Sequence, residues 1–131
     1  MSSDAGVNLS DFADLFTDED KARLLENGRD GFTKDRVPVV RLLEPLTNAS
    51  WFISAINPSN MSQLWGLVDL RNGTPEVGPI DWAQLSLFRN AENEPLVRDD
   101  LFQAEGRTLS QLLAEAKERG EIDPRWGNIF D

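Results

Sequence analysis

The sequence contains no histidine, no cysteine and no tyrosine among its 131 residues. Without cysteine the chain forms neither a disulfide framework nor a thiolate metal site, which fits a reducing compartment, and we expect a cytoplasmic protein. Without histidine, no imidazole is available as a base, so a serine nucleophile would need a lysine or a carboxylate to activate it. These absences favour macromolecular binding over catalysis, and we expect neither a cofactor nor a metal site.

Long apolar runs are also missing. No run approaches the ~20 residues that a membrane-spanning helix needs. The first residues lack the basic and apolar regions of a secretory signal, so we expect no export and no membrane partner. Acidic side chains outnumber basic ones by 23 to 13, for a net charge of −10. Direct nucleic-acid binding is disfavoured, because neutralisation of phosphates supplies most of its affinity.

The negative charge is concentrated at the two ends of the chain. Met1–Asp20 carries six acidic side chains and no basic one. Lys21–Asn90 carries seven acidic and eight basic side chains, and Ala91–Asp131 carries ten acidic and five basic ones. Part of this charge has a predicted local role, since Asp11 and Asp18–Asp20 fall in first turns of predicted helices, where the helix dipole favours carboxylates. The remainder would attract a basic protein surface, which is the partner that we expect.

Two short helices are predicted near the N-terminus. In the first, apolar residues recur at i, i+3, i+4 and i+7, which is typical of one helix face. These residues are Leu9, Phe12, Ala13 and Phe16. A second helix is expected to start at Thr17 and to end at Asn27-Gly28, a pair that commonly ends helices in the left-handed conformation.

Four apolar runs bounded by turn residues predict antiparallel strands. They are Val37–Leu43, Trp51–Ile56, Leu64–Leu70 and Thr74–Ile80. The Asn72-Gly73 pair is the strongest hairpin signal. Pro75 and Pro79 cannot donate to a ladder, so the fourth run is predicted to be an edge strand. The second and third runs are apolar on both faces, and both faces therefore need a cover.

The remaining segments complete an α+β prediction. Asp81 is expected to cap a short helix over Trp82–Phe88, and Leu96–Phe102 reads as a fifth strand. A capping box over Thr108–Gln111 opens a last helix that stops at Gly120. The predicted fold is a four- or five-stranded, mostly antiparallel sheet with helices packed on it.

Seven segments in order also resemble a known family. They are Leu15-Phe16-Thr17, Ala22–Gly28, Val37–Leu42, Ala49-Ser50-Trp51, Gly66–Leu70, Gly73–Gly78 and Arg98-Asp99. Together they resemble a small bacterial family known only as domain of unknown function 2958, common on plasmids, integrated elements and phages. The resemblance runs from about Leu15 to Ile122 and implies a compact α+β domain in a mobile-element setting, without any activity or site residue. It divides the chain into an acidic, partly helical extension (1–14), a single domain (15–122) and a tail (123–131).

Asp69 and Glu76 are the best candidates for catalysis. The hairpin at Asn72-Gly73 could bring them together, and two carboxylates can perform acid/base hydrolysis, as in glycosidases. The competing interpretation is structural: Asp69 accepts backbone N–H groups in its turn, and Glu76 pairs with Arg71 or Arg98.

Aromatic and apolar residues are the candidates for binding a partner. Trp51 and Trp65 lie at strand centres and are expected in the core, whereas Trp82 and Trp126 lie on less regular segments and are expected to be exposed anchors. The predicted N-terminal helix either offers its apolar face to a partner groove or covers a face of its own sheet. The candidate partner-binding residues are Leu9, Phe12, Phe16, Trp82 and Trp126.

Three functions remain open on this basis. The leading hypothesis is a non-enzymatic protein-binding module of mobile-element type, in its specific form an acidic inhibitor of a host nucleic-acid-processing or defence complex. The first alternative is a small hydrolase that uses the paired carboxylates. The second is a structural homo-oligomer, a homodimer in its simplest form, in which the doubly apolar sheet packs against its copy.

Overall fold

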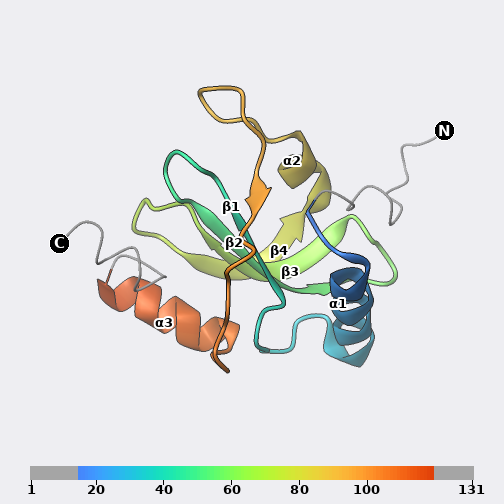
Figure 1. Cartoon of the computed structure of the whole chain (residues 1–131). Coiled ribbons are helices and arrows are strands. Elements are labelled where there is room, and N and C mark those ends of the chain that lie inside the picture. Colours follow the sequence, from blue (N-terminus) through green and yellow to red (C-terminus); the bar gives the residue numbers. More distant parts are fainter. Residues whose placement is uncertain (1–14, 120–131) are drawn as a thin grey trace.

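A computed structural model describes residues 15–119, which form a five-stranded antiparallel sheet with helices packed on it (Figure 1). The strand order is β4-β3-β2-β1-β5. The strands are β1 (Val40–Leu43), β2 (Ser50–Ile56), β3 (Gln63–Asp69), β4 (Glu76–Asp81) and β5 (Val97–Arg98). The helices are α1 (Asp18–Gly31), α2 (Trp82–Leu87) and α3 (Leu109–Arg119). The predicted α+β fold is confirmed.

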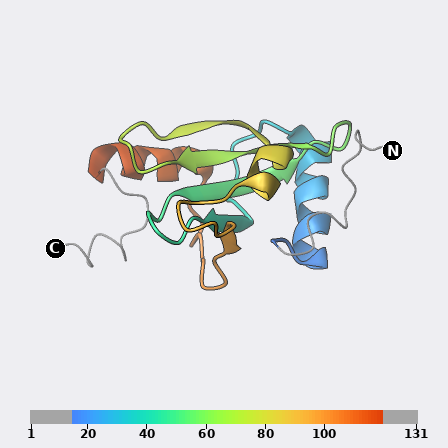
Figure 2. The same ribbon diagram turned by 90° about the horizontal axis from the view of Figure 1, so that it is seen from above.

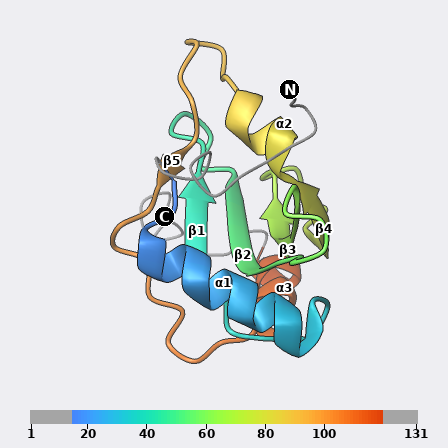
Figure 3. The same ribbon diagram turned by 90° about the vertical axis from the view of Figure 1, so that its right-hand side faces the viewer.

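Helices cover both faces of the sheet. Figure 3 shows α1 crossing in front of the strands with α3 behind them, and Figure 2 shows the strands between these two helices. One core cluster joins the sheet to α1 and α2 through residues such as Leu24, Ile53 and Leu85. A second cluster joins it to α3 through Phe52, Leu67, Leu109, Leu112 and Ala116. The two-sided apolar pattern of the central strands therefore has an internal cover on each side.

A β-bulge in β2 shapes the larger core cluster. The register against β3 shifts between Ile53 and Ala55, which leaves Ser54 as the extra residue. Ile53 and Ile56 are three residues apart, so a regular strand would point them to opposite faces, yet both belong to the cluster under α1 and α2. The hydroxyl of Ser54 donates to the carbonyl of Trp65 at 3.2 Å, which satisfies it inside the sheet.

Helix α1 continues through Asn27 and Gly28, where the sequence predicted its end. Gly28 is buried, and a Cβ atom added there would lie 1.9 Å from the carbonyl oxygen of Ile56. The missing side chain thus lets the helix backbone touch β2. The side-chain amide of Asn27 donates to the carbonyl of Ser54 at 2.9 Å. The pair is a helix–strand contact, and its interpretation as a helix end was wrong.

The start of α1 is a capping box. The hydroxyl of Thr17 accepts the N–H of Asp20 at 3.0 Å, and the carboxylate of Asp20 accepts the N–H of Thr17 at 3.0 Å. Phe16 precedes this cap in a bend, so it does not continue a helix from Leu9 as predicted. The cap requires Thr17 to be extended, with φ −73° and ψ 167°. Leu9 and Phe12 lie outside the described residues.

The strand boundaries differ most at β1 and β5. The first strand begins at Val40 instead of Val37, after Pro38, which has no N–H for a ladder. The fifth covers only Val97–Arg98 instead of continuing to Phe102, because the carboxylate of Asp99 accepts the N–H of Leu101 at 3.0 Å and turns the chain. The prediction of β4 as an edge strand is confirmed.

The loop after α1 fixes the start of α3. The predicted capping box is present, with the N–H of Thr108 donating to Gln111 Oε1 at 2.8 Å. Asp35 adds a second cap. Its carboxylate accepts hydrogen bonds from the N–H of Ser110 at 3.0 Å and from the hydroxyl of Ser110 at 2.6 Å. Burial alone would raise the pKa of Asp35, but these hydrogen bonds outweigh it and the pKa is lowered.

The two tryptophans at strand centres differ in burial. Trp51 is in the core, as predicted, and its ring meets Phe88 edge-on at 5.9 Å. Trp65 is half-buried beside the second cluster and meets Phe32 edge-on at 5.7 Å.

Among residues 15–119, no helix combines the length and apolar character needed to cross a bilayer.

Gly28→Ala tests the helix–strand contact. We expect the free energy of unfolding to fall by about 2 kcal/mol or more, because the added methyl group overpacks against the Ile56 carbonyl. Urea unfolding measures the change. Gly78→Ala in β4 is the matched control, since nothing lies within 4 Å of its added Cβ. Equal stability of the two variants would contradict the close contact.

Candidate functional site

A groove of about 660 Å³ opens between the start of α1, helix α2 and the segment that leads into β5. We call it the α2 groove. Its lining comes from three segments that are far apart in the sequence. The lining residues are Leu15, Phe16, Thr17, Trp82, Leu85, Ser86, Arg89, Pro95, Leu96, Val97, Arg98 and Asp100.

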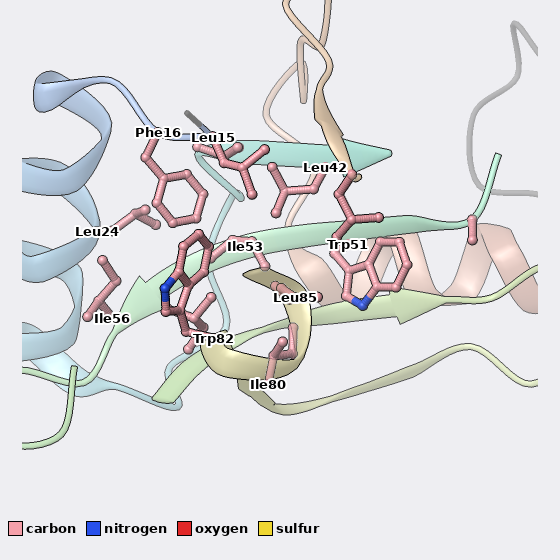
Figure 4. Packing of buried hydrophobic residues seen from close by; sticks show 14 residues of the cluster. Leu15, Phe16, Leu24, Leu42, Trp51, Ile53, Ile56, Ile80, Trp82 and Leu85 are labelled. Atoms are coloured by element: carbon pink, nitrogen blue, oxygen red, sulfur yellow. The ribbon is translucent and has the colours of Figure 1, made fainter. Parts of the chain in front are cut away.

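The floor of the groove is a packed aromatic pair. The rings of Phe16 and Trp82 lie 5.6 Å apart and face each other between α1 and α2 (Figure 4). Trp82 is 3% exposed, so the prediction that it is an exposed anchor was wrong. The reason is local: β4 runs directly into α2, and Asp81 caps the helix by accepting the N–H of Ala83 at 2.9 Å, which turns Trp82 onto the core.

Phe16 is buried as well, at 2% exposure. It therefore packs on its own domain, as the alternative interpretation of the N-terminal segment held, and does not project toward a partner. Phe16 and Trp82 instead form a preformed floor. The other predicted anchors, Leu9, Phe12 and Trp126, lie outside the described residues.

One exposed apolar side chain lines the groove, and two others directly follow a lining residue in the sequence. Six large hydrophobic residues of the described chain are exposed, and three of them either line the groove or directly follow a lining residue. These are Leu87 on α2, Val97 in β5 and Leu101 in the following turn. Leu87 is 78% and Leu101 is 76% exposed. Apolar side chains gathered at a hollow are typical of an interaction surface.

Two arginines of the rim differ in their surroundings. Arg98 pairs with Asp20 of α1 and with Asp100 at 3.0 Å, so its charge is compensated. Arg89 is exposed, and its guanidinium donates to the backbone carbonyl of Phe88 at 2.6 Å. Of the two arginines in the described lining, Arg89 is thus the one without an ion pair to residues 15–119.

A buried carboxylate holds the outer wall of the groove. Glu44 follows β1 and accepts four hydrogen bonds: from the N–H of Leu46 at 2.6 Å, from the N–H and hydroxyl of Thr47 at 3.0 and 2.6 Å, and from the amide of Asn90 at 2.8 Å. Asn90 also bonds Glu94 in the loop that leads to the groove. Burial alone would raise the pKa of Glu44, but the donors outweigh it and lower the pKa to about 2.

A second polar cluster lies on the α3 face of the sheet. Arg41 is 1% exposed, and its guanidinium donates twice to the hydroxyl of Ser50, at 2.8 and 3.1 Å, and to Asp99 at 2.9 Å. It also lies 5.4 Å from the ring centre of Phe52. Sequence reasoning missed this residue, although a single arginine inside an apolar strand was the available signal. Because Arg41 ties β5 to β1 and β2, we interpret the cluster as structural.

The structure does not bring Asp69 and Glu76 together. Val68 is the cross-strand partner of Glu76, so the next residue, Asp69, points to the opposite face of the sheet. Asp69 is buried and accepts the N–H of Arg71 at 2.9 Å, which confirms the predicted local bond. Its other oxygen is buried without a hydrogen-bond partner. Glu76 is exposed, whereas Arg98, one of its predicted partners, pairs with acids elsewhere.

Metal ligation finds no support in residues 15–119, which contain no group of three or more His, Cys, Asp or Glu placed to hold an ion. The acidic start of α1 is used otherwise. Asp18 pairs with Lys21 at 3.0 Å, and Asp20 serves both the capping box and Arg98.

A family model described as "Protein of unknown function (DUF2958)" matches residues 15–123. No curated protein and no solved structure matches the chain.

Glu44→Gln tests the hydrogen-bonded carboxylate. We expect a loss of about 2 kcal/mol in the free energy of unfolding at neutral pH, because the donors lose a charged acceptor. The folded pKa is lowered, so this stabilisation is present above about 4.5 and is lost as the pH falls toward about 2. Urea unfolding across this range measures it. Glu92→Gln, an exposed change in the loop that contains Asn90, is the control. If the stability difference between the unmodified chain and Glu44→Gln did not depend on pH, the proposed role of the Glu44 carboxylate would be contradicted.

Arg41→Ala tests the structural role of the second cluster. Removing Arg41 takes the paired guanidinium away from Asp99, whose side chain is 11% exposed, and we expect the free energy of unfolding to fall by about 3–5 kcal/mol. Thermal unfolding followed by circular dichroism measures the loss. Arg89→Ala removes an exposed arginine and should change stability by no more than about 0.5 kcal/mol. A similar effect of both variants would show that the cluster is not a structural tie.

Proposed function

The chain belongs to the DUF2958 family, whose description assigns no activity, and we propose that it is a non-enzymatic protein-binding module that receives apolar side chains of a partner in the α2 groove. The observation that carries this proposal is an exposed apolar residue in the groove lining, Val97, together with the exposed Leu87 and Leu101, each of which directly follows a lining residue. An apolar centre inside a polar rim is the usual anatomy of a protein interface.

The preformed floor favours binding without rearrangement. Phe16 and Trp82 are already packed against each other and against the core, so a partner need not order them. Binding that orders few side chains loses little conformational entropy. The partner would bury Val97 and the exposed leucines that follow lining residues, Leu87 and Leu101, and these are the side chains whose contacts we expect to dominate affinity.

Charge supports a partner with a basic surface. Residues 15–119 carry seventeen acidic and twelve basic side chains, and the fourteen residues before them carry three acidic and no basic ones. Such an excess speeds the encounter with a cationic surface. However, many carboxylates are used locally, as at Asp35, Glu44 and Asp99, so those described do not form a phosphate-like row. This favours steering combined with apolar anchoring over mimicry of DNA.

Inhibition of a host nucleic-acid-processing or defence complex, in the cytoplasm and in a mobile-element setting, is the specific role that we propose for such binding.

Neither alternative, the hydrolase or the homo-oligomer, gains support from the geometry. The hydrolase requires Asp69 and Glu76 on one face of the sheet, and they lie on opposite faces. The homo-oligomer was inferred from an uncovered apolar sheet, and α1, α2 and α3 provide the cover.

Leu87→Asp tests the proposed binding surface. The full chain is immobilised, exposed to extract of the native host, and the captured proteins are identified by mass spectrometry. We expect one partner to bind the unmodified chain and to bind Leu87→Asp about tenfold less, because an apolar anchor has become charged. Capture should also weaken when salt is raised roughly tenfold, since steering is screened.

Leu70→Asp is the matched control, because Leu70 is exposed in the turn after β3 and, unlike Leu87, does not adjoin a lining residue of the α2 groove. It should retain the partner. An equal loss of captured partner in the two variants would overturn the proposal. So would capture that changes neither with Leu87→Asp nor with salt.

A further inference from the structure

We propose that Asn72 is a site of spontaneous modification, at which the folded turn between β3 and β4 converts this asparagine into aspartate and isoaspartate. This deamidation goes beyond the proposed function, because Asn72 lies outside the lining of the α2 groove. Three observations support it. They are the accessibility of the Gly73 amide, the hydrogen bonds of the Asn72 side chain, and the contrast with the other Asn-Gly pair of the chain.

The reaction joins the asparagine side chain to the next backbone nitrogen. The nitrogen of Gly73 gives up its proton and bonds to Cγ of Asn72, the Cγ–Nδ2 bond breaks, and the amide nitrogen leaves as ammonia. A succinimide ring results. Water then opens either of the two C–N bonds that the ring nitrogen makes to its carbonyl carbons, which gives aspartate or isoaspartate. Water is therefore the only co-reactant.

The backbone nitrogen that must attack is accessible. Residues 70–75 connect β3 to β4, and Asn72 and Gly73 are both exposed there. Within the described part of the chain, the N–H of Gly73 donates no hydrogen bond. Nothing lies within 4 Å of the position that a Cβ atom would take at Gly73. Water can therefore reach this N–H, and the new ring has room to form.

The Asn72 side chain is held in a turn that activates it. Its Oδ1 accepts the N–H of Thr74 at 3.1 Å and the hydroxyl of Thr74 at 2.8 Å. These bonds span Gly73 and so fold the side-chain amide back toward the attacking nitrogen. Two donors on one carbonyl oxygen also stabilise the negative charge that develops there during the attack, as in an oxyanion hole. The turn therefore supplies both proximity and charge stabilisation.

The other Asn-Gly pair has the same residues in the opposite environment. Asn27 and Gly28 lie inside α1, where the N–H of Gly28 belongs to the helix ladder. The carbonyl oxygen of Ile56 lies 1.9 Å from an added Cβ at Gly28, so a ring has no room to form. The Asn27 side chain is also tied to β2, because its amide donates to the carbonyl of Ser54 at 2.9 Å. We expect Asn27 to be protected while the domain is folded.

The modification changes both the charge and the backbone of the β3–β4 connection. Either product adds a negative charge to a chain whose net charge is already −10. Isoaspartate also carries the main chain through its Cγ, which lengthens the connection by one carbon. The pair nearest this connection is Val68 with Glu76, and β4 has no further strand beyond it in the sheet. We therefore expect this end of the edge ladder to loosen while the domain stays folded.

Ageing of the full chain tests the site. The protein is incubated at mildly alkaline pH, digested at acidic pH and mapped by mass spectrometry, with aspartyl and isoaspartyl peptides separated by chromatography. We expect Asn72 to convert at least roughly tenfold faster than Asn27, because the Gly28 amide is released only when α1 opens. In guanidinium chloride the two rates should become similar, since both residues then precede an unconstrained glycine. Equal rates in the folded chain, or no conversion of Asn72 there, would overturn the proposal.

Changes at Thr74 test the role of the turn. Thr74→Val removes the hydroxyl and keeps the N–H, and we expect conversion of Asn72 in the folded chain to slow about fivefold, the effect of one hydrogen bond. Thr74→Ser is the matched control, because it keeps both donors and should convert at the rate of the unmodified chain. Thr74 is exposed, so both variants should fold. An unchanged rate in Thr74→Val, or an equal loss in Thr74→Ser, would overturn activation by the turn.

Discussion

The structure depends on the hairpin of β2 and β3, whose residues are apolar on both faces of the sheet. Such a hairpin is unstable unless both faces are covered, and this requirement places α1 and α2 on one side and α3 on the other. Backbone contact is close where α1 meets the sheet and where β3 meets β2. Gly28 lets α1 touch Ile56, and Gly66 in β3 lies so near Phe52 that an added Cβ would be 2.1 Å from its carbonyl oxygen. Gly28 thus lets a helix approach the sheet, and Gly66 lets β3 approach β2, more closely than a side chain would allow.

The fold could be predicted from the sequence because its signals are local. Short apolar runs, the Asn72-Gly73 turn, and Pro79 in β4 with Pro75 just before it define strand order at short range, and Thr108 with Gln111 defines a helix start. The errors arose where a long-range contact overrides a local preference. Asn27-Gly28 has the sequence of a helix end, but its contact with β2 continues the helix. Nothing local reveals that contact.

The groove lies beyond such reasoning for the same reason. Its floor combines Phe16, which precedes α1, with Trp82, which follows β4, and the two are distant in the sequence. Trp82 appeared to be an exposed anchor because its segment is irregular, yet a single capping residue turns it inward. Asp69 shows the opposite case: a turn carboxylate that bonds its own backbone is a local feature, and it was predicted correctly. A hydrogen bond within a turn, such as that of Asp69, can be predicted from the neighbouring residues. A contact between distant segments, such as that of Phe16 with Trp82, depends on the topology of the fold.

The brevity of β5 has a consequence for the order in which the domain forms and opens. This strand has two residues, pairs with β1 across more than fifty positions of the chain, and is secured by the contacts of Arg41 with Asp99 and of Arg98 with Asp20. Closing so long a loop for so few backbone hydrogen bonds gains little early in folding, so β5 joins after the β2–β3 hairpin. For the same reason, we expect β5 to be the first part of the sheet to exchange its amide protons in the native state. One wall of the groove is therefore formed by the least stable strand of the sheet, β5. The opposite wall belongs to the helical core.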